Sequence, residues 1–266
     1  MLKLFKIEWL KIKEYKTFWS LFIIFLVMDP LAFYFFASKY MESHGGGQQE
    51  AMIKAFLGSP FVLPKVWHSS AWIGGLYFVM IGMLYILLIT NEVQYRTHRQ
   101  NIIDGWSRID FLKAKLSLLI FFVLSATAIV FLAGLLVGLV YTTGSYDMFE
   151  EIYYIGYFAL MATIYMMVAF LIAILVKRTG LSIIIYFALV CIVDNVLWAI
   201  LTFKKSQFGY FLPLECGDSL VPNPFKPRQM ETRTISDIAL IGTVIAYSAL
   251  FGYIIVSYFR RTDLKT

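Results

Sequence analysis

The sequence predicts an all-α polytopic membrane protein with six transmembrane helices and a further amphipathic helix at its N-terminus. Two observations indicate this fold class. Of the 266 residues, 60% are hydrophobic and 15% are charged, at a mean hydropathy of +0.73, whereas soluble domains carry roughly 25% charged residues. The chain also contains six apolar runs, each near the ~20 helical residues that a hydrocarbon core of ~30 Å requires. These runs cover about residues 18–38, 70–90, 115–141, 153–176, 181–202 and 237–259.

The six runs should be helices that form one membrane domain over residues 1–266. In lipid, backbone polar groups must be hydrogen-bonded within the segment, which a helix achieves. The fourth and fifth runs are separated only by Lys177-Arg178-Thr179-Gly180, which predicts a tight basic turn. Two long segments, 39–69 and 203–236, should lie outside the cell. The second contains four prolines, which argue against one continuous helix.

The basic residues predict the orientation. With the N-terminus inside, the inside segments carry 15 of the 23 Lys and Arg residues, and the longer outside segments carry 8. The outside loop 142–152 has three acids and no base. Because cytoplasmic loops are enriched in Lys and Arg, we expect a multi-pass protein of the plasma (inner) membrane with both termini in the cytoplasm.

The N-terminal residues 1–16, MLKLFKIEWLKIKEYK, place Leu2, Phe5, Trp9 and Ile12 on one helical face and most of the lysines elsewhere. This pattern is typical of an amphipathic helix that lies on the inner membrane surface in contact with lipid. The alternative is a basic flank of the first span without a role of its own.

Motifs for chemistry are missing from the sequence. No G-x-x-x-x-G-K-[ST] loop occurs, so we expect no ATP site. The three histidines are scattered and no H-E-x-x-H motif occurs, so we expect no metal site. Glu150-Glu151 lacks the arginine of an E-E-x-x-x-R protease motif, because position 155 is Ile. The net charge of +6 follows from membrane orientation, and we expect no nucleic-acid partner.

Two acids lie in the apolar runs. Asp29, followed by Pro30, interrupts the first, and Asp194 lies in the fifth. An intramembrane charge costs ~3 kcal/mol, which makes each acid a candidate for a pathway or gating role; the alternative is hydrogen bonding within the bundle. Gly134 and Gly138 form a G-x-x-x-G motif, which predicts close helix packing, either within the chain or between two copies.

The loop at 91–114 has internal order. Gly105 suits the end of a short helix, and Ser107-Arg108-Ile109-Asp110 matches a capping pattern that should begin the next helix. We therefore expect a helix, a sharp turn and a helix at the cytoplasmic face; the alternative is an ordinary solvated connector. Apolar residues recur here at intervals of three and four: Ile102, Ile103, Trp106, Ile109 and Leu112.

This loop resembles the segment after the second span of ABC-2-type transporter permeases. The resemblance implies a coupling helix that docks into a separate ATPase subunit. The layout of a basic N-terminal helix, six spans and no ATP site is also similar. Arg96-Thr97 stands where the family often has Gly-Thr, which leaves the subfamily open. The residues implied in docking are Glu92, Arg96, Arg99, Gly105, Trp106, Ser107 and Arg108, with Lys113 or Lys115 following the motif.

The resemblance implies the permease subunit of an ATP-driven ABC exporter. Two permease chains, identical or similar, would form the pathway, and two ATPase subunits that bind ATP and Mg would drive it. The chain itself would catalyse nothing and would hold no cofactor. Two alternatives stay open: an ion-coupled secondary transporter, for which only Asp29 and Asp194 speak, and a membrane scaffold without a pathway. The sequence does not identify the transported substrate.

Overall fold

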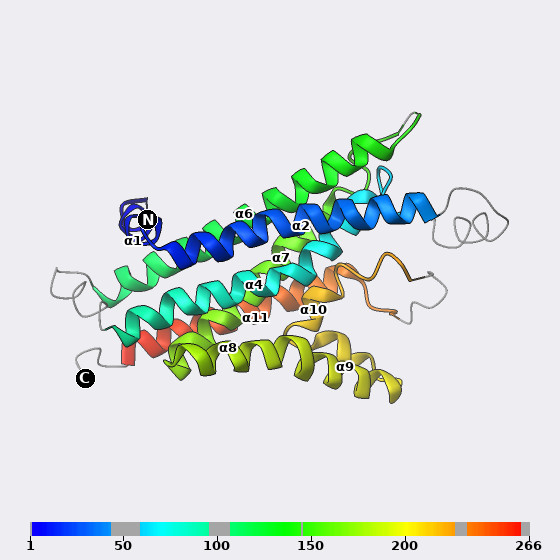
Figure 1. The fold of residues 1–266 in the computed structure, drawn as a ribbon. Coiled ribbons are helices and arrows are strands. Elements are labelled where there is room, and N and C mark those ends of the chain that lie inside the picture. Colours follow the sequence, from blue (N-terminus) through cyan, green and yellow to red (C-terminus); the bar gives the residue numbers. More distant parts are fainter. Residues whose placement is uncertain (1, 44–58, 96–106, 145, 227–232, 262–266) are drawn as a thin grey trace.

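The computed structural model describes residues 2–43, 59–95, 107–144, 146–226 and 233–261, and every regular element in these ranges is a helix (Figure 1). Six helical stretches are long and apolar enough to cross a membrane. The all-α class and the six spans are therefore confirmed. The stretches are α2 (Lys16–Ser43), α4 (Val66–Gln94), α6 (Arg108–Tyr141), α7 (Tyr153–Val176), the continuous stretch Thr179–Phe203, and α11 (Asp237–Arg261).

Helices α4 and α7 form the centre of the bundle. Helix α7 contacts α4, α6 and α11, and α4 contacts α2 and α6 as well. In the most apolar window of each helix, 67% of α7 and 61% of α4 are buried, against 17% of Thr179–Phe203 and of α11. The outer helices thus leave broad apolar faces for lipid. Fully buried aromatic side chains fill the centre: Phe78, Tyr85, Phe122, Phe158 and Phe170.

Helix α1 (Leu2–Lys13) lies across one end of the bundle. Figure 1 shows it nearly end-on, while α2 and α6 run across the view. Its expected apolar face contacts protein: Ile12 is buried, and the rings of Phe5 and Trp9 lie 5.7 and 5.4 Å from that of Phe121 on α6. The side chain of Leu2 lies outside the described residues. We call this end of the bundle, where α4 ends and α6 begins, the base.

The fifth span is interrupted by a π-helical turn. It consists of α8 (Thr179–Ala188), η1 (Leu189–Val193) and α9 (Asp194–Phe203). Such turns disturb the regular backbone ladder, and here Asn195 Nδ2 donates to the Val190 carbonyl at 2.9 Å. The short turn before this span is formed by Lys177, which has a φ of 57° and ends α7 in the left-handed conformation. A lysine therefore takes the conformation that glycine usually supplies at a helix end.

The chain after α9 folds back into the bundle at the end opposite the base. We call residues 207–221 the re-entrant segment; it contains η2 (Gln207–Phe211) and α10 (Glu215–Asp218). Helix α10 contacts α7, α9 and α11, and Figure 1 shows it between α9 and α11. Leu214, Cys216 and Leu220 are buried. This part of the predicted external loop is therefore an element of the core.

Helices α4 and α8 approach each other closely at Gly82. A Cβ atom at this position would lie 2.1 Å from the hydroxyl oxygen of Tyr186, which is fully buried. Only a residue without a side chain allows this approach, so Gly82 sets the spacing of the second and fifth spans.

We expect Gly82→Ala to destabilise the protein by about 1–3 kcal/mol, because the added methyl group overpacks a filled interface. The matched control is Gly156→Ala in α7, where a Cβ atom would meet nothing within 4 Å. That variant should keep or raise the melting temperature in detergent. Equal melting temperatures for the two variants would contradict the close approach.

Candidate functional site

Four charged side chains form a cluster at the base. The ammonium of Lys115, in the first turns of α6, lies 2.5 Å from Glu8 Oε2 on α1 and 2.6 Å from Glu92 Oε1 at the end of α4. Lys11 on α1 lies 2.9 Å from Glu8 Oε1 and 3.6 Å from Glu92 Oε1. The side chains of Lys115 and Glu8 are each 1% exposed. One buried lysine thus joins three helices.

The cluster is electrically balanced, since it contains two acids and two bases. Burial acts to raise the pKa of Glu8, but the charges of Lys115 and Lys11 outweigh burial and hold that pKa below its ordinary value. Both carboxylates are therefore placed to accept from ammonium groups. Removing one partner of such a buried pair leaves an uncompensated charge and costs about 3–5 kcal/mol.

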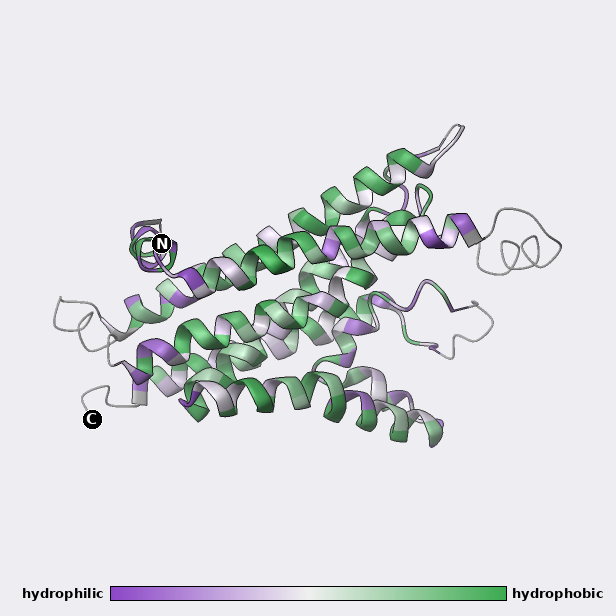
Figure 2. Cartoon of the chain, viewed as in Figure 1, coloured by the Kyte–Doolittle hydropathy of each residue, from purple (hydrophilic) through white to green (hydrophobic). Residues whose placement is uncertain are grey.

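Further hydrogen bonds attach the end of α4 to its neighbours. Asn91 Nδ2 donates to the hydroxyl of Tyr15, between α1 and α2, at 2.9 Å. Thr90 Oγ1 donates to Thr179 Oγ1, at the start of α8, at 2.9 Å. Tyr85 donates from its hydroxyl to the Lys115 carbonyl at 2.9 Å. Figure 2 shows the corresponding concentration of hydrophilic residues at α1 and at the adjoining ends of α4 and α6.

The cluster involves the two helix ends between which the chain runs from α4 to α6, with Glu92 near the end of α4 and Lys115 near the start of α6. The predicted cap of α6 is confirmed: Ser107 Oγ accepts from the Asp110 N–H at 3.1 Å, and Asp110 Oδ2 accepts from the Ser107 N–H at 3.2 Å. Both ends of the loop are thus fixed, one by this cap and the other by Glu92.

The predicted docking residues are only partly within the described structure. Arg96, Arg99, Gly105 and Trp106 lie outside the described residues, as does the side chain of Arg108. Glu92 binds Lys115. Docking by this set of residues stays a prediction.

Sequence reasoning missed Glu8, Lys11 and Lys115 as a unit. From the sequence alone, Lys115 counts only as part of the loop motif and of the excess of inside basic residues. Two signals were present in the sequence. Glu8 is the one acid among the first 13 residues, and Lys115 directly precedes a long uncharged run.

The two intramembrane acids have different surroundings. Asp29 is 2% exposed, and its Oδ1 has no hydrogen-bond partner in the described part of the chain. Pro30 beside it is accommodated within α2. Asp194 is buried and accepts hydrogen bonds from the backbone N–H groups of Leu214 and Glu215. Asp194 thus attaches the fifth span to the re-entrant segment.

The two glycines of the G-x-x-x-G motif face the second span of the same chain. A Cβ atom at Gly134 would lie 2.7 Å from Ser70 Oγ, and one at Gly138 would lie 3.1 Å from a methyl carbon of Val66. Their lack of side chains lets α6 approach α4, as small residues do in membrane bundles. The structure thus places both glycines at a contact within the chain.

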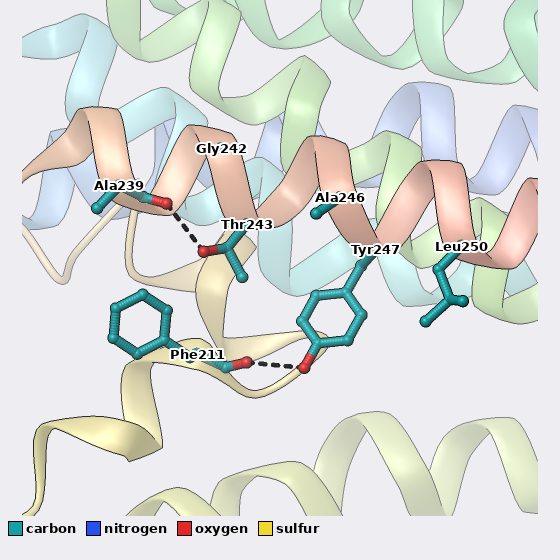
Figure 3. Close-up of a pocket in the computed structure, with 7 residues that line it drawn as sticks. All are labelled: Phe211, Ala239, Gly242, Thr243, Ala246, Tyr247 and Leu250. Carbon is teal, nitrogen blue, oxygen red and sulfur yellow. Dashed lines mark hydrogen bonds between the residues drawn. The ribbon is translucent and has the colours of Figure 1, made fainter.

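A groove runs along α11 (Figure 3). Its hydroxyl groups already donate within the chain, Thr243 to the Ala239 carbonyl at 2.8 Å and Tyr247 to the Phe211 carbonyl at 3.1 Å. The groove therefore presents a mainly apolar wall. Its lining consists of Phe211, Ala239, Gly242, Thr243, Ala246, Tyr247 and Leu250.

We expect Lys115→Met to destabilise the protein by about 3–5 kcal/mol, because Glu8 and Glu92 would lose their buried ammonium partner and two acids would be left with Lys11 as the one base of the cluster. The control is Lys113→Met, which changes an exposed lysine on the same helix.

The lowered pKa of Glu8 sets the pH dependence of the stability of the wild-type protein. The stabilisation is present above the ordinary value of 4.5 and is lost as the pH falls through the lowered value. Thermal unfolding in detergent measures both effects, and equal loss in the two variants would refute the role of the cluster.

Comparison with known proteins supports the resemblance to ABC-2 transporter permeases. The sequence profile of the ABC-2 family transporter protein matches residues 4–195, a range that includes most of α1, the first four spans and the fifth span up to the start of α9. No curated protein and no solved structure matches the chain. The profile covers well over half of the 266 residues. The chain therefore belongs to the ABC-2 family of transporter membrane proteins.

Proposed function

We propose that the chain is the permease subunit of an ATP-driven ABC exporter and works with a separate ATPase subunit. The observation that carries this proposal is the family match over residues 4–195, which includes the loop and the charged cluster. The chain catalyses no reaction itself, and ATP and Mg bind to the partner. The excess of basic residues in the inside segments supports an orientation with the base and both termini in the cytoplasm.

The buried cluster suggests how force enters the bundle. The loop between α4 and α6 is the segment that we assign to ATPase docking. Lys115 joins the two ends of that loop to each other and to α1. A displacement of the loop therefore moves α1, α4 and α6 together. ATP binding draws two ATPase subunits towards each other and shifts a pair of permease chains between inward- and outward-facing states.

The intramembrane acids are candidates for the pathway or its gating. Asp29 supports this role best, because it is buried inside α2 and one of its oxygens has no partner in the described residues. The same observation favours the second candidate function, an ion-coupled secondary transporter, since such proteins use intramembrane carboxyls. Activity without any ATPase would distinguish that function from the exporter.

We expect Trp106→Ala and Arg108→Ala to reduce recovery of the ATPase with the affinity-purified chain by about tenfold or more, because aromatic and arginine side chains dominate docking energies. The control is Phe203→Ala, which removes an aromatic ring that is 89% exposed at the other end of the bundle. Recovery and the coupling of hydrolysis to transport are measured on the same preparations. Unchanged recovery and coupling in both loop variants would contradict the proposal.

A further inference from the structure

Three carboxyl groups meet where the re-entrant segment enters the bundle. Asp194 begins α9, and Glu215 and Asp218 begin and end α10. Asp194 and Glu215 are buried, and Asp218 is partly buried. Each lies within electrostatic reach of the other two.

Hydrogen bonds through these carboxyls hold the segment in place. The hydroxyl of Tyr165, on the central helix α7, lies 2.8 and 2.9 Å from the two oxygens of Asp218. Asp194 accepts from the backbone N–H groups of Leu214 and Glu215. Glu215 Oε1 accepts from Ser219 Oγ at 2.8 Å. One hydroxyl proton cannot serve both oxygens of Asp218 fully, so the site is short of donors.

In the described part of the chain, this acidic cluster has no paired base. Within the ranges that the structure describes, no Lys or Arg forms an ion pair with any of the three carboxyls. The Arg233 guanidinium donates to the Ser219 carbonyl and pairs with Asp237, and Lys226 acts weakly on Glu215. Helix η2 contains no charged residue. Other described titratable groups that interact with these acids are Tyr165 of α7, Tyr186 of α8 and Cys216 of α10, and Tyr247 of α11 interacts with Asp194 and Cys216.

We propose that Asp194, Glu215 and Asp218 form a proton-dependent latch that holds residues 207–221 in the bundle. When protons neutralise part of this charge, the hydrogen bonds from Tyr165, from Ser219 and from the backbone N–H groups keep the segment in place. When all three are ionised, three negative charges lie within electrostatic reach of one another in a largely buried site, and no Lys or Arg of the described residues pairs with them. The segment then leaves for solvent, where the charges are hydrated.

The direction of the pH dependence follows from the raised pKa values. Burial, reinforced by Asp218, raises the pKa of Glu215 from 4.5 to about 8. Burial raises the pKa of Asp218 from 3.8 to about 7. Protonation therefore stabilises the seated segment, fully below the ordinary values, and this stabilisation is lost as the pH rises through about 7 to about 8. This consequence rests on the proposed orientation: with the re-entrant segment on the outer side of the membrane, an alkaline exterior releases it.

Cys216 is a native reporter for the latch. It is a free thiol, it is fully buried, and it lies between the two acids of α10. The other cysteine, Cys191, is replaced by serine. The rate of maleimide labelling of Cys216 is measured on the full-length chain in detergent at ~pH 6 and ~pH 8.5, on either side of the raised pKa values. The protection factor is the labelling rate of the denatured chain divided by that of the folded chain at the same pH. This ratio removes the effect of pH on the reactivity of the thiol itself.

The Cys191→Ser chain, in which Glu215 and Asp218 are intact, is the parent chain. Its protection factor should fall about tenfold or more from the lower to the higher pH. A Glu215→Gln/Asp218→Asn variant should keep its high protection at ~pH 8.5, because its side chains cannot ionise. Glu150→Gln removes an exposed acid outside the cluster and should behave like the parent chain.

Constant protection of the parent chain over this range would overturn the latch, whether or not the double variant folds. An equal fall in the parent chain and the double variant would also overturn it. Elution as a single folded species at both pH values assigns the loss of protection to local release. The measurement needs neither an ATPase nor transport, so its failure leaves the proposed function standing.

Discussion

The rest of the structure depends on one ammonium group, that of Lys115, which is held between the carboxylates of Glu8 and Glu92 at the base of the bundle. A lysine is rarely buried unless it is paired. Here the pairing partners come from two other helices, so burial of this lysine requires that α1, α4 and α6 be assembled together. The energetic demand of one buried charge thus becomes a geometric constraint on three helices, two of which, α4 and α6, flank the loop that we propose for ATPase docking.

Buried charges at the two ends of the bundle differ in whether acids are paired with bases. At the base, two bases balance two acids, and the cluster is fixed over the ordinary pH range. At the other end, three carboxyls lie near one another with no ion-paired base among the described residues, and their charge depends on protons. A balanced ion cluster at the base and the proposed releasable segment at the other end would suit the proposed permease, which takes force at one end of the bundle and opens at the other.

The sequence predicted what depends on local pattern. Hydropathy located the six spans because each one must cover the same hydrocarbon thickness, and Ser107 with Asp110 predicted the start of α6 because a capping box involves neighbouring residues. The contact between Glu8 and Lys115 joins residues 107 positions apart, which no local pattern encodes. Likewise, the prolines after α9 excluded a long helix but could not show that Leu214 and Cys216 are buried in the core. The face of α1 was expected from its periodicity, whereas its contact with Phe121 depended on tertiary packing.

The most direct test of the central claim is a distance measurement across the base in a complex with the proposed ATPase subunit. Spin labels are placed at Lys6 on α1 and Lys113 on α6, both exposed, in a chain without native cysteines. A second pair of spin labels is placed at Lys113 and at Phe203, at the far end of the fifth span. If the cluster makes α1 and α6 one body, the first distance stays constant between the nucleotide-free and vanadate-trapped states while the second changes. A first distance that changes as much as the second would contradict the account.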